Sequence, residues 1–378
     1  MNTKLNTRIF AMIAALAGIW IFFTIKSPDF IGARNLSMLA IDLSITSTLA
    51  LGMLLIILTG NIDLSAGSGV GLIGGIASVL IFFHGLPAPL AMLCGLGAAL
   101  ILWPTMGWLV ANQKMPSFII TLGGLLVFKG LFWLVINNQT VPVVAGGKSN
   151  LYSILTTYYL PPVAGWILVG LASTILIWSK MRQRARRLAQ NVPVEDGEMF
   201  FLKLFLPVQM LLLFLIIVNQ YRGVPLSAII LGFVALVIHL ITTQTPFGRH
   251  LYAVGGNEEA AHISGLPVQR VVIAAYALMG GVVALTGFLQ TAYAGASTTT
   301  VGELMELDAV AACVIGGASL KGGRGDVVGV LFGALIMASL LNGMTLMAVP
   351  PEIKFIARGL VLALAVWLDI AMSRNRTV

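Results

Sequence analysis

Residues 88–111 read APLAMLCGLGAALILWPTMGWLVA and contain no charged side chain. An α-helix of about 20 apolar residues is long enough to cross a bilayer core of roughly 30 Å. A strand of a transmembrane β-barrel needs only ~10 residues, and its polar and apolar side chains alternate. The uninterrupted stretch therefore predicts a membrane-spanning helix rather than a barrel strand.

The rest of the chain repeats this pattern. Of its 378 residues, 58% are hydrophobic and 10% are charged, whereas soluble proteins have about 25% charged residues. Two of the apolar segments are short and glycine-rich, 67–83 and 306–319, so we expect partial or re-entrant passages there. The sequence predicts an all-α integral membrane protein, a polytopic helical bundle with about 10 (10–12) transmembrane segments, including broken or short helices. The apolar segments are 9–25, 36–59, 67–83, 88–111, 117–136, 161–179, 200–218, 226–243, 271–293, 306–319, 327–347 and 354–372.

The basic residues predict the orientation in the membrane. The chain has a net charge of +8, and the expected loop Lys180–Arg187 has five basic residues in eight positions. Lys and Arg concentrate on the cytoplasmic side and attract anionic membrane lipids, so this excess needs no nucleic acid as partner. If every segment crosses, both termini are cytoplasmic and the segment 137–159 lies on the opposite side. The other basic residues on the cytoplasmic side are then Lys4, Arg8, Arg249, His250, Arg270, Arg374 and Arg376.

A polar stretch, FGRHLYAVGGNEEAAHISGLPVQR at 247–270, interrupts the apolar second half. After a turn at the two glycines, Asn257 is a candidate N-cap, and Glu258 and Glu259 suit the first turn of a helix. Gly265 is a candidate C-cap, with a proline soon after it. The stretch predicts a helix of two to three turns. It is either an ordinary capped loop helix or a docking element for a cytoplasmic partner.

Asp63 lies between Asn61 and Ser65, at the boundary of two apolar runs. A carboxylate inside a membrane costs roughly 2.5 to 3.5 kcal/mol, so it usually has a task or a partner. In one interpretation Asp63 lines a pathway or holds a break between two helices. In the other it is an interfacial loop residue that caps the next helix beside Ser65.

A second group of acids, Glu303, Glu306 and Asp308, precedes the short segment 306–319. Glu303 and Glu306 are three residues apart and would share one helix face. In one interpretation these acids stabilise the N-terminus of the following helix. In the other they contribute to a gate or to the docking of a soluble binding protein. Lys129, inside another apolar segment, is expected to reach the interface or to pair with an acid.

Two glycine patterns echo each other, Leu64-Ser-Ala-Gly67-Ser-Gly69 and Leu320-Lys-Gly-Gly323-Arg-Gly325. Transport proteins often consist of two related halves with a site between them. In a chain with 41 glycines, a chance match is the alternative, and both interpretations stay open.

Motifs for nucleotide or metal chemistry are missing from the sequence. No Gly-x-x-x-x-Gly-Lys-[Ser/Thr] P-loop occurs, so the chain is not expected to hydrolyse ATP. The acids near residue 306 have no histidine beside them, which argues against a metal site. We expect neither an enzyme nor a bound cofactor.

Four blocks carry a family resemblance: GNIDLSAGSGVGLIGG at 60–75, KMPSFIITLGGL at 114–125, GGNEEAAHISGLPVQR at 255–270 and ELDAVAACVIGGASLKGGRG at 306–325. In this order they resemble the permease subunits of monosaccharide ABC importers of the ribose/xylose/arabinose type. The similarity runs from about residue 8 to residue 372, nearly the whole chain.

Other residues bear on the branch of this family. YRGVP at 221–225, NGMTLMAVP at 342–350 and AVWLD at 365–369 are similar to the xylose permeases. Asn61 and Ala66 depart from the family pattern, which has Gly and Val at these positions in many members. The exact sugar is therefore left open, with D-xylose favoured.

The resemblance implies one permease domain over 1–378 in the bacterial inner membrane. It also implies a coupling helix at 255–266 that contacts a separate ABC ATPase, which binds the ATP and Mg. Further implied partners are a second copy of the chain and a periplasmic sugar-binding protein. The residues implied for ATPase coupling are Gly255, Gly256, Asn257, Glu258, Glu259, Ala260, Ala261, Ser264 and Gly265. Those considered for the pathway or a gate are Asn61, Asp63, Ser65, Glu306 and Asp308.

An ion-coupled secondary transporter of a small polar solute is the alternative function. It would need buried titratable groups in the middle of the membrane, arranged as a relay. In the sequence only Asp63 and Lys129 come close to this requirement.

Overall fold

The computed structural model describes the backbone of residues 2–194 and 196–374, and the side chains of residues 10–194 and 196–367. The side chains of Lys4, Arg8, Arg374 and Arg376, used above for orientation, lie outside the described residues. The helices are α1 (Asn2–Lys26), η1 (Pro28–Ile31), α2 (Ala33–Leu58), α3 (Ala66–Phe82), α4 (Ala88–Asn112), α5 (Ser117–Val135), α6 (Leu151–Thr157), α7 (Pro162–Ala189), α8 (Gly197–Asn219), α9 (Leu226–Gln244), α10 (Pro246–Gly256), α11 (Glu258–Ile263), α12 (Val268–Ala294), α13 (Met305–Gly316), α14 (Val327–Leu346) and α15 (Pro351–Arg374).

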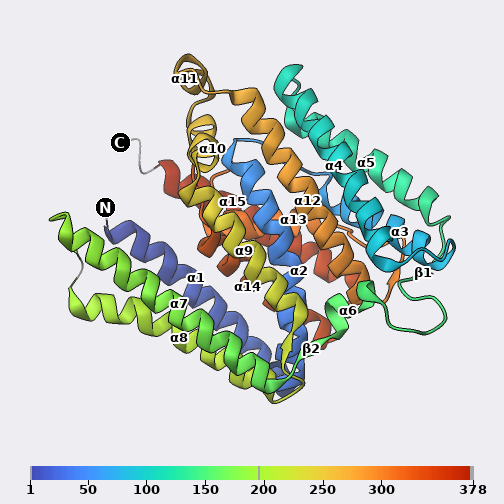
Figure 1. Cartoon of the computed structure of the whole chain (residues 1–378), viewed down its shortest axis with the longest axis horizontal. Coiled ribbons are helices and arrows are strands. Elements are labelled where there is room, and N and C mark those ends of the chain that lie inside the picture. The colour runs from blue at the N-terminus through green and yellow to red at the C-terminus, as the bar shows by residue number, and fades with distance from the viewer. Residues whose placement is uncertain (1, 195, 375–378) are drawn as a thin grey trace.

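The predicted fold class is confirmed. Among the described residues, eight helices are long and apolar enough to cross a membrane, and two shorter apolar helices, Phe10–Lys26 and Ala66–Phe82, bring the number to ten. The predicted stretch 88–111 is α4, Ala88–Asn112, with Pro104 inside the helix. Figure 1 shows the long helices side by side, tilted in a common direction.

Helices α2 and α12 form the centre of the bundle. Most of α2 is buried along its length, and the two helices approach closely where Gly52 lies against the side chains of Met279 and Val282. Helix α4 lies on the other side of α12, where a side chain at Gly280 would meet the carbonyl oxygen of Ala99. Small residues at such crossings let helix backbones pack directly in a membrane.

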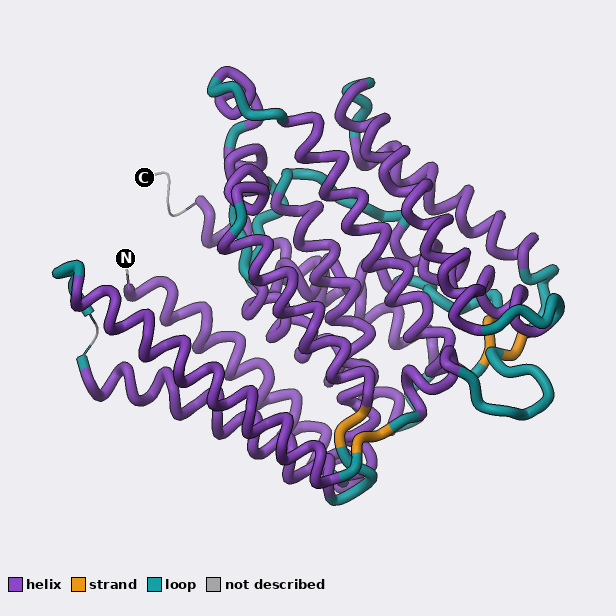
Figure 2. Tube along the Cα trace, in the orientation of Figure 1, coloured by secondary structure: helices purple, strands orange, loops and turns teal. Residues whose placement is uncertain are grey.

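The two short glycine-rich segments are helices shorter than a full span. Helix α13 has 12 residues, which is about 18 Å of helix and too short for a bilayer core of roughly 30 Å. Helix α3 has 17 residues and follows an irregular segment that runs inside the bundle (Figure 2). The two helices begin side by side, because Gly67 lies against Gly302 and the carboxylate of Glu306.

From this meeting point the two short helices run to opposite ends of the bundle. The middle of α3 contacts Phe132, Ile136 and Tyr152. The last residue of α13, Gly316, lies against Gly329 at the start of α14. Each short helix therefore crosses the core together with the non-helical segment before it, as a broken span.

Short strands connect the loops at one end of the bundle (Figure 2). Strand β1 (Val141–Pro142) pairs antiparallel with β4 (Ala296–Ser297), and β2 (Tyr159–Leu160) pairs antiparallel with β3 (Val224–Pro225). The start of α1, the connection from α7 to α8, α11 and the end of α15 all lie at the other end (Figure 1). The basic residues predict that these segments lie on one side of the membrane, and the structure has all of them at one end of the bundle.

Two local predictions were wrong. The basic run Lys180–Arg187 was expected as a loop but continues α7, which ends at Ala189. Glu303 and Glu306 do not share a helix face, because α13 begins at Met305 after Leu304 in a left-handed conformation, φ 59°. In both places the residues can adopt helical or non-helical backbone, and packing against the flanking structure determines which of the two forms.

Candidate functional site

Helix α11 is the projecting element at one end of the bundle (Figure 1). Asn257 is its N-cap, as predicted, and its Oδ1 accepts a hydrogen bond of 2.9 Å from the amide of Ala260. Gly265 follows the helix with φ +80°, the left-handed conformation expected of a glycine at a helix end. The helix has six residues, fewer than two turns, and is thus shorter than predicted.

Most side chains of α11 point away from the bundle. Glu258, Glu259 and Ala260 are exposed, and Ile263 is 79% exposed although it is apolar. Ala261 is buried against the core, and Leu266 packs against it from the following turn. The helix is therefore fixed on one side and presents acids, a small residue and an isoleucine on the other.

Helix α10 supports α11 from below. Gly248, Leu251 and Val254 are buried, so one face of α10 lies on the bundle. The two glycines predicted as a turn, Gly255 and Gly256, instead end this helix. Because α10 leads directly through Asn257 into α11, a displacement of α11 reaches the end of α10.

The end of α10 lies against two other segments, and we call this contact the glycine junction (Gly60, Gly255, Gly322 and Gly323). A Cβ at Gly255 would overlap the carbonyl oxygen of Leu58, the last residue of α2. The amide of Gly323 donates to that same oxygen over 3.1 Å. A Cβ at Gly322 would meet the Gly255 oxygen at 2.6 Å and the Gly60 nitrogen at 2.8 Å.

The glycine junction includes one motif of the sequence echo. Gly322 and Gly323 belong to the second motif, and Gly60, which Gly322 meets, lies four residues before the first. Tyr252 adds a hydrogen bond of 2.8 Å from its hydroxyl to the oxygen of Gly325. Burial raises the pKa of Tyr252 above its ordinary value, and the carboxylate of Asp326 adds to this rise. The phenol therefore stays protonated and keeps its role as donor.

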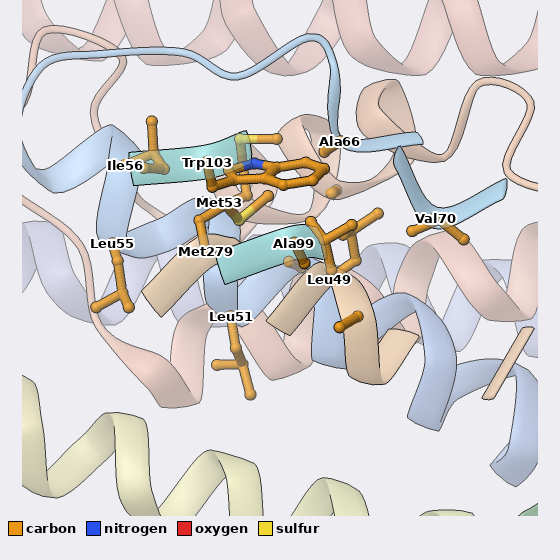
Figure 3. Packing of buried hydrophobic residues seen from close by; sticks show 14 of the residues in the cluster. Leu49, Leu51, Met53, Leu55, Ile56, Ala66, Val70, Ala99, Trp103 and Met279 are labelled. Carbon is orange, nitrogen blue, oxygen red and sulfur yellow. The ribbon is translucent and has the colours of Figure 1, made fainter. Parts of the chain in front are cut away.

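Asp63 is fully buried and has three hydrogen-bond donors around its carboxylate. The Trp103 indole donates to Oδ2 over 2.7 Å, and the amide and hydroxyl of Ser65 donate to Oδ1 over 2.8 and 2.5 Å. Figure 3 shows the indole of Trp103 in the core near Met53 and Ala66. This arrangement fits the interpretation in which Asp63 holds a helix break. Trp103 is 0% exposed, although tryptophans of membrane proteins are enriched at the membrane–water interfaces.

Asn61, Glu306 and Asp308 have neighbours other than the Asp63 carboxylate. The amide of Asn61 donates to the Thr59 hydroxyl over 2.9 Å. Glu306 is buried in the first turn of α13, against Gly67. Asp308 is also buried and pairs with Arg358 of α15 at 3.3 Å.

A polar cavity of about 350 Å³ lies where α2, α13, α14 and α15 meet. Ligand pockets typically have about 300–1,000 Å³. In the described part of the chain, Oδ1 of Asp308 and Nε of Arg358 are buried and have no hydrogen-bond partner. The cavity thus offers unsatisfied donors and acceptors. Its polar lining includes Asp42, Thr46, Gln290, Asp308, Asn342 and Arg358.

Asp42 is the residue that the sequence analysis missed. It lies in α2 within hydrogen-bond reach of Tyr293 and Asn342. The statement that only Asp63 and Lys129 approach a mid-membrane titratable group was therefore wrong. The available signal was a single acid inside the apolar segment 36–59, which is rare enough to indicate function.

Lys129 pairs with an acid, which was one of its two predicted roles. Its Nζ lies 3.9 Å from Oε1 of Glu303 and 5.5 Å from the centre of the Trp133 ring. The Trp133 indole also donates to the oxygen of Thr299 over 3.3 Å. These contacts connect α5 to the segment before α13.

Comparison with known proteins assigns the chain to a family. A family profile described as the branched-chain amino acid transport system / permease component matches residues 35–366. The chain belongs to this permease family. No solved structure matches it.

The permease is similar over its whole length to two kinds of sugar transport protein. It is 40% identical to the xylose transport system permease protein XylH of Escherichia coli K12, with 98% of this chain and 94% of the relative covered. It is 39% identical to the protein of the same name from Haemophilus influenzae, with 98% of each covered. The ribose import permease protein RbsC of Bacillus subtilis is 31% identical, with 92% and 88% covered. The resemblance stated from the motifs is confirmed, and the permease is a transport subunit rather than an enzyme.

Proposed function

We propose that the permease is the transmembrane subunit of an ATP-binding-cassette importer for a monosaccharide, D-xylose or a similar pentose or hexose. The observation that carries this proposal is the 40% identity to a xylose transport permease over 98% of the chain. In the proposed complex a separate ATPase binds ATP and Mg, and a periplasmic binding protein delivers the sugar. The permease acts in the inner membrane as a homodimer, with α11 and both termini in the cytoplasm.

The exposed face of α11 is the proposed docking surface for the ATPase. Glu258, Glu259, Ala260 and Ser264 are exposed there, and the exposed Ile263 at the end of the helix gives an apolar contact. Small exposed residues beside acids fit a helix that enters a groove of a partner. In this role Ala261 holds the helix on the core and does not touch the ATPase.

The glycine junction is the proposed route from α11 to the cavity. Three helices have one end near the junction and line the cavity elsewhere: α2, α13 and α14. Along α2, Asp42 and Leu58 are separated by about 24 Å of helix. Because packed helices move as rigid bodies, a shift of α10 against Leu58 can change the opening of the cavity.

The cavity is the proposed passage for the sugar. A neutral sugar presents many hydroxyl groups, each of which can donate and accept hydrogen bonds. Asp42 and Asp308 offer acceptors, Arg358 offers donors, and Gln290 and Asn342 offer both. Of the predicted pathway residues, Asp308 lines this cavity, whereas Asp63 and Ser65 belong to the hydrogen-bond network with Trp103.

Uptake into proteoliposomes tests this function. The permease is reconstituted with its ATPase and binding protein, and labelled xylose, ribose and arabinose are supplied outside with ATP inside. The proposal expects uptake that requires ATP and the ATPase and is unchanged by a proton ionophore. Uptake that needs a proton gradient and proceeds without the ATPase would overturn it.

A secondary transporter remains the second candidate because three acids line the cavity: Asp42, Glu303 and Asp308. Buried acids in transporters often carry protons. The same experiment separates the two functions, since only the secondary transporter would be driven by an imposed pH gradient.

A further inference from the structure

Helices α7 and α8 lie side by side and diverge from the central helices of the bundle (Figure 1). Their buried residues are confined to one end, where Gly165 and Val169 of α7 meet Leu215 and Val218 of α8 and Val224 of β3. Toward the other end both helices expose large apolar side chains, such as Ile175 and Phe205. In a membrane protein this exposed surface is in contact with lipid.

A second cavity, of about 200 Å³, lies between the two helices at that other end. Four of its lining residues are basic: Lys180, Arg184 and Arg187 from α7, and Lys203 from α8. Among the described residues no carboxylate lines it, and Asp196 and Glu198 at the start of α8 are exposed. The wall of the cavity that α7 contributes is therefore positive.

Arg184 is the central residue of this cavity. Its guanidinium lies 4.6 Å from the centre of the Phe200 ring, which holds the group in place between the helices. Its Nη1 is buried and has no hydrogen-bond partner in the part of the chain that the structure describes. A buried donor without a partner is costly, and a planar guanidinium matches the oxygens of a phosphate.

The concentration of Lys and Arg on the cytoplasmic side of a membrane explains why the end of α7 is basic. It does not explain why basic side chains line a cavity. Basic residues on a cytoplasmic helix end need no particular geometry to fix topology. Basic side chains also stabilise the C-terminus of α7 through the helix dipole, and this effect does not require them to point into a cavity. An inward-facing guanidinium with an unsatisfied nitrogen instead indicates a bound anion.

The depth of the cavity identifies the source of that anion. Trp178 of α7 is 59% exposed, and the Arg182 guanidinium lies 5.1 Å from the centre of its ring. Exposed tryptophans next to basic residues are typical of the headgroup level of a bilayer. Basic pockets between transmembrane helices at this level bind anionic lipid headgroups.

We propose that the cavity between α7 and α8 binds the phosphate of an anionic phospholipid, with Arg184 and Arg187 as its main contacts. The acyl chains lie along the exposed apolar faces of the two helices. The bound lipid fills the space between helices that have few contacts with the rest of the chain. It therefore stabilises their pairing.

Lipid binding to the purified full-length chain tests this proposal. The permease in detergent is titrated with phosphatidylglycerol, phosphatidylcholine or inorganic phosphate, and bound lipid is measured by native mass spectrometry. The double variant Arg184→Gln/Arg187→Gln is compared with Arg182→Gln/Arg186→Gln, which removes the same charge from α7 outside the cavity lining. The melting temperature of each variant without lipid shows whether it is folded.

The expected result is preferential binding of phosphatidylglycerol, with the affinity of the cavity variant at least about tenfold below that of the control variant. Arg184→Lys keeps the charge but loses the planar fork and should give an intermediate affinity. Equal losses in both double variants would show diffuse charge attraction and overturn the site. Binding of inorganic phosphate with no preference for phosphatidylglycerol would overturn the lipid as its ligand.

Discussion

The carbonyl oxygen of Leu58 accepts a hydrogen bond of 3.1 Å from the amide of Gly323, and Gly255 lies against the same oxygen. One backbone atom at the end of α2 thus contacts both the loop before α14 and the helix that carries α11. Side chains are excluded from this contact, so it depends on glycine at position 255.

Replacing Gly255 with alanine should disrupt this contact. The added methyl group would overlap the Leu58 oxygen, and overpacking of this kind costs about 1–3 kcal/mol. Gly255→Ala should therefore lower the melting temperature of the purified permease and impair transport. Gly256→Ala is the matched control, because a Cβ at Gly256 has open space around it. If both variants melt at the same temperature, the glycine junction is not a close-packed contact.

Trp103 should be needed for the break between α2 and α3. Trp103→Phe removes the donor to the buried carboxylate of Asp63, and a charged group left with an unmet hydrogen bond costs about 1–3 kcal/mol. The variant should unfold at a lower temperature than the wild type. Trp108→Phe, on the same helix but 44% exposed, should change the melting temperature little. An unchanged melting temperature of Trp103→Phe would exclude this role for the pair.

Asp308 and Arg358 should behave as a coupled pair in stability. Asp308→Asn leaves the largely buried Arg358 without its charge partner, 3.3 Å away, and breaking a buried pair costs about 3–5 kcal/mol. Adding Arg358→Gln should restore much of the lost stability, as measured by melting temperatures in a double-mutant cycle. Additive effects of the two substitutions would contradict the pairing.

Asp42 should matter for transport more than for stability. Asp42→Asn keeps the size of the side chain and its reach to Tyr293 and Asn342 but removes one carboxylate from the cavity lining. Uptake should fall while the melting temperature stays near that of the wild type. Asp29→Asn, at an acid outside the cavity lining, serves as control. Wild-type uptake by Asp42→Asn would remove Asp42 from the proposed passage.

Much of the fold could be predicted from the sequence because its signals are local. Apolar length located the twelve main helical segments, and the Asn257 cap depends on neighbouring residues. The fold class and the family could be predicted for the same reason.

The tertiary features could not be predicted in this way. The different roles of Gly255 and Gly256 follow from what lies opposite each glycine, and the sequence does not contain that information in local form. The pairing of Trp103 with Asp63 joins residues 40 positions apart, and no local pattern indicates it. Asp42 was visible as an acid in an apolar segment, but its cavity needs residues from α12, α13, α14 and α15.

Docking of the ATPase on α11 is the central claim, and site-specific crosslinking tests it most directly. The exposed Cys94 is first replaced by serine, and a single cysteine is introduced as His262→Cys on α11 or as Lys148→Cys in the segment near the opposite end of the bundle. In reconstituted complexes active in ATP-driven uptake, a short bifunctional thiol reagent should join the permease to the ATPase through position 262 and not through position 148. Active complexes in which position 262 gives no crosslink to the ATPase, while another surface does, would contradict the account.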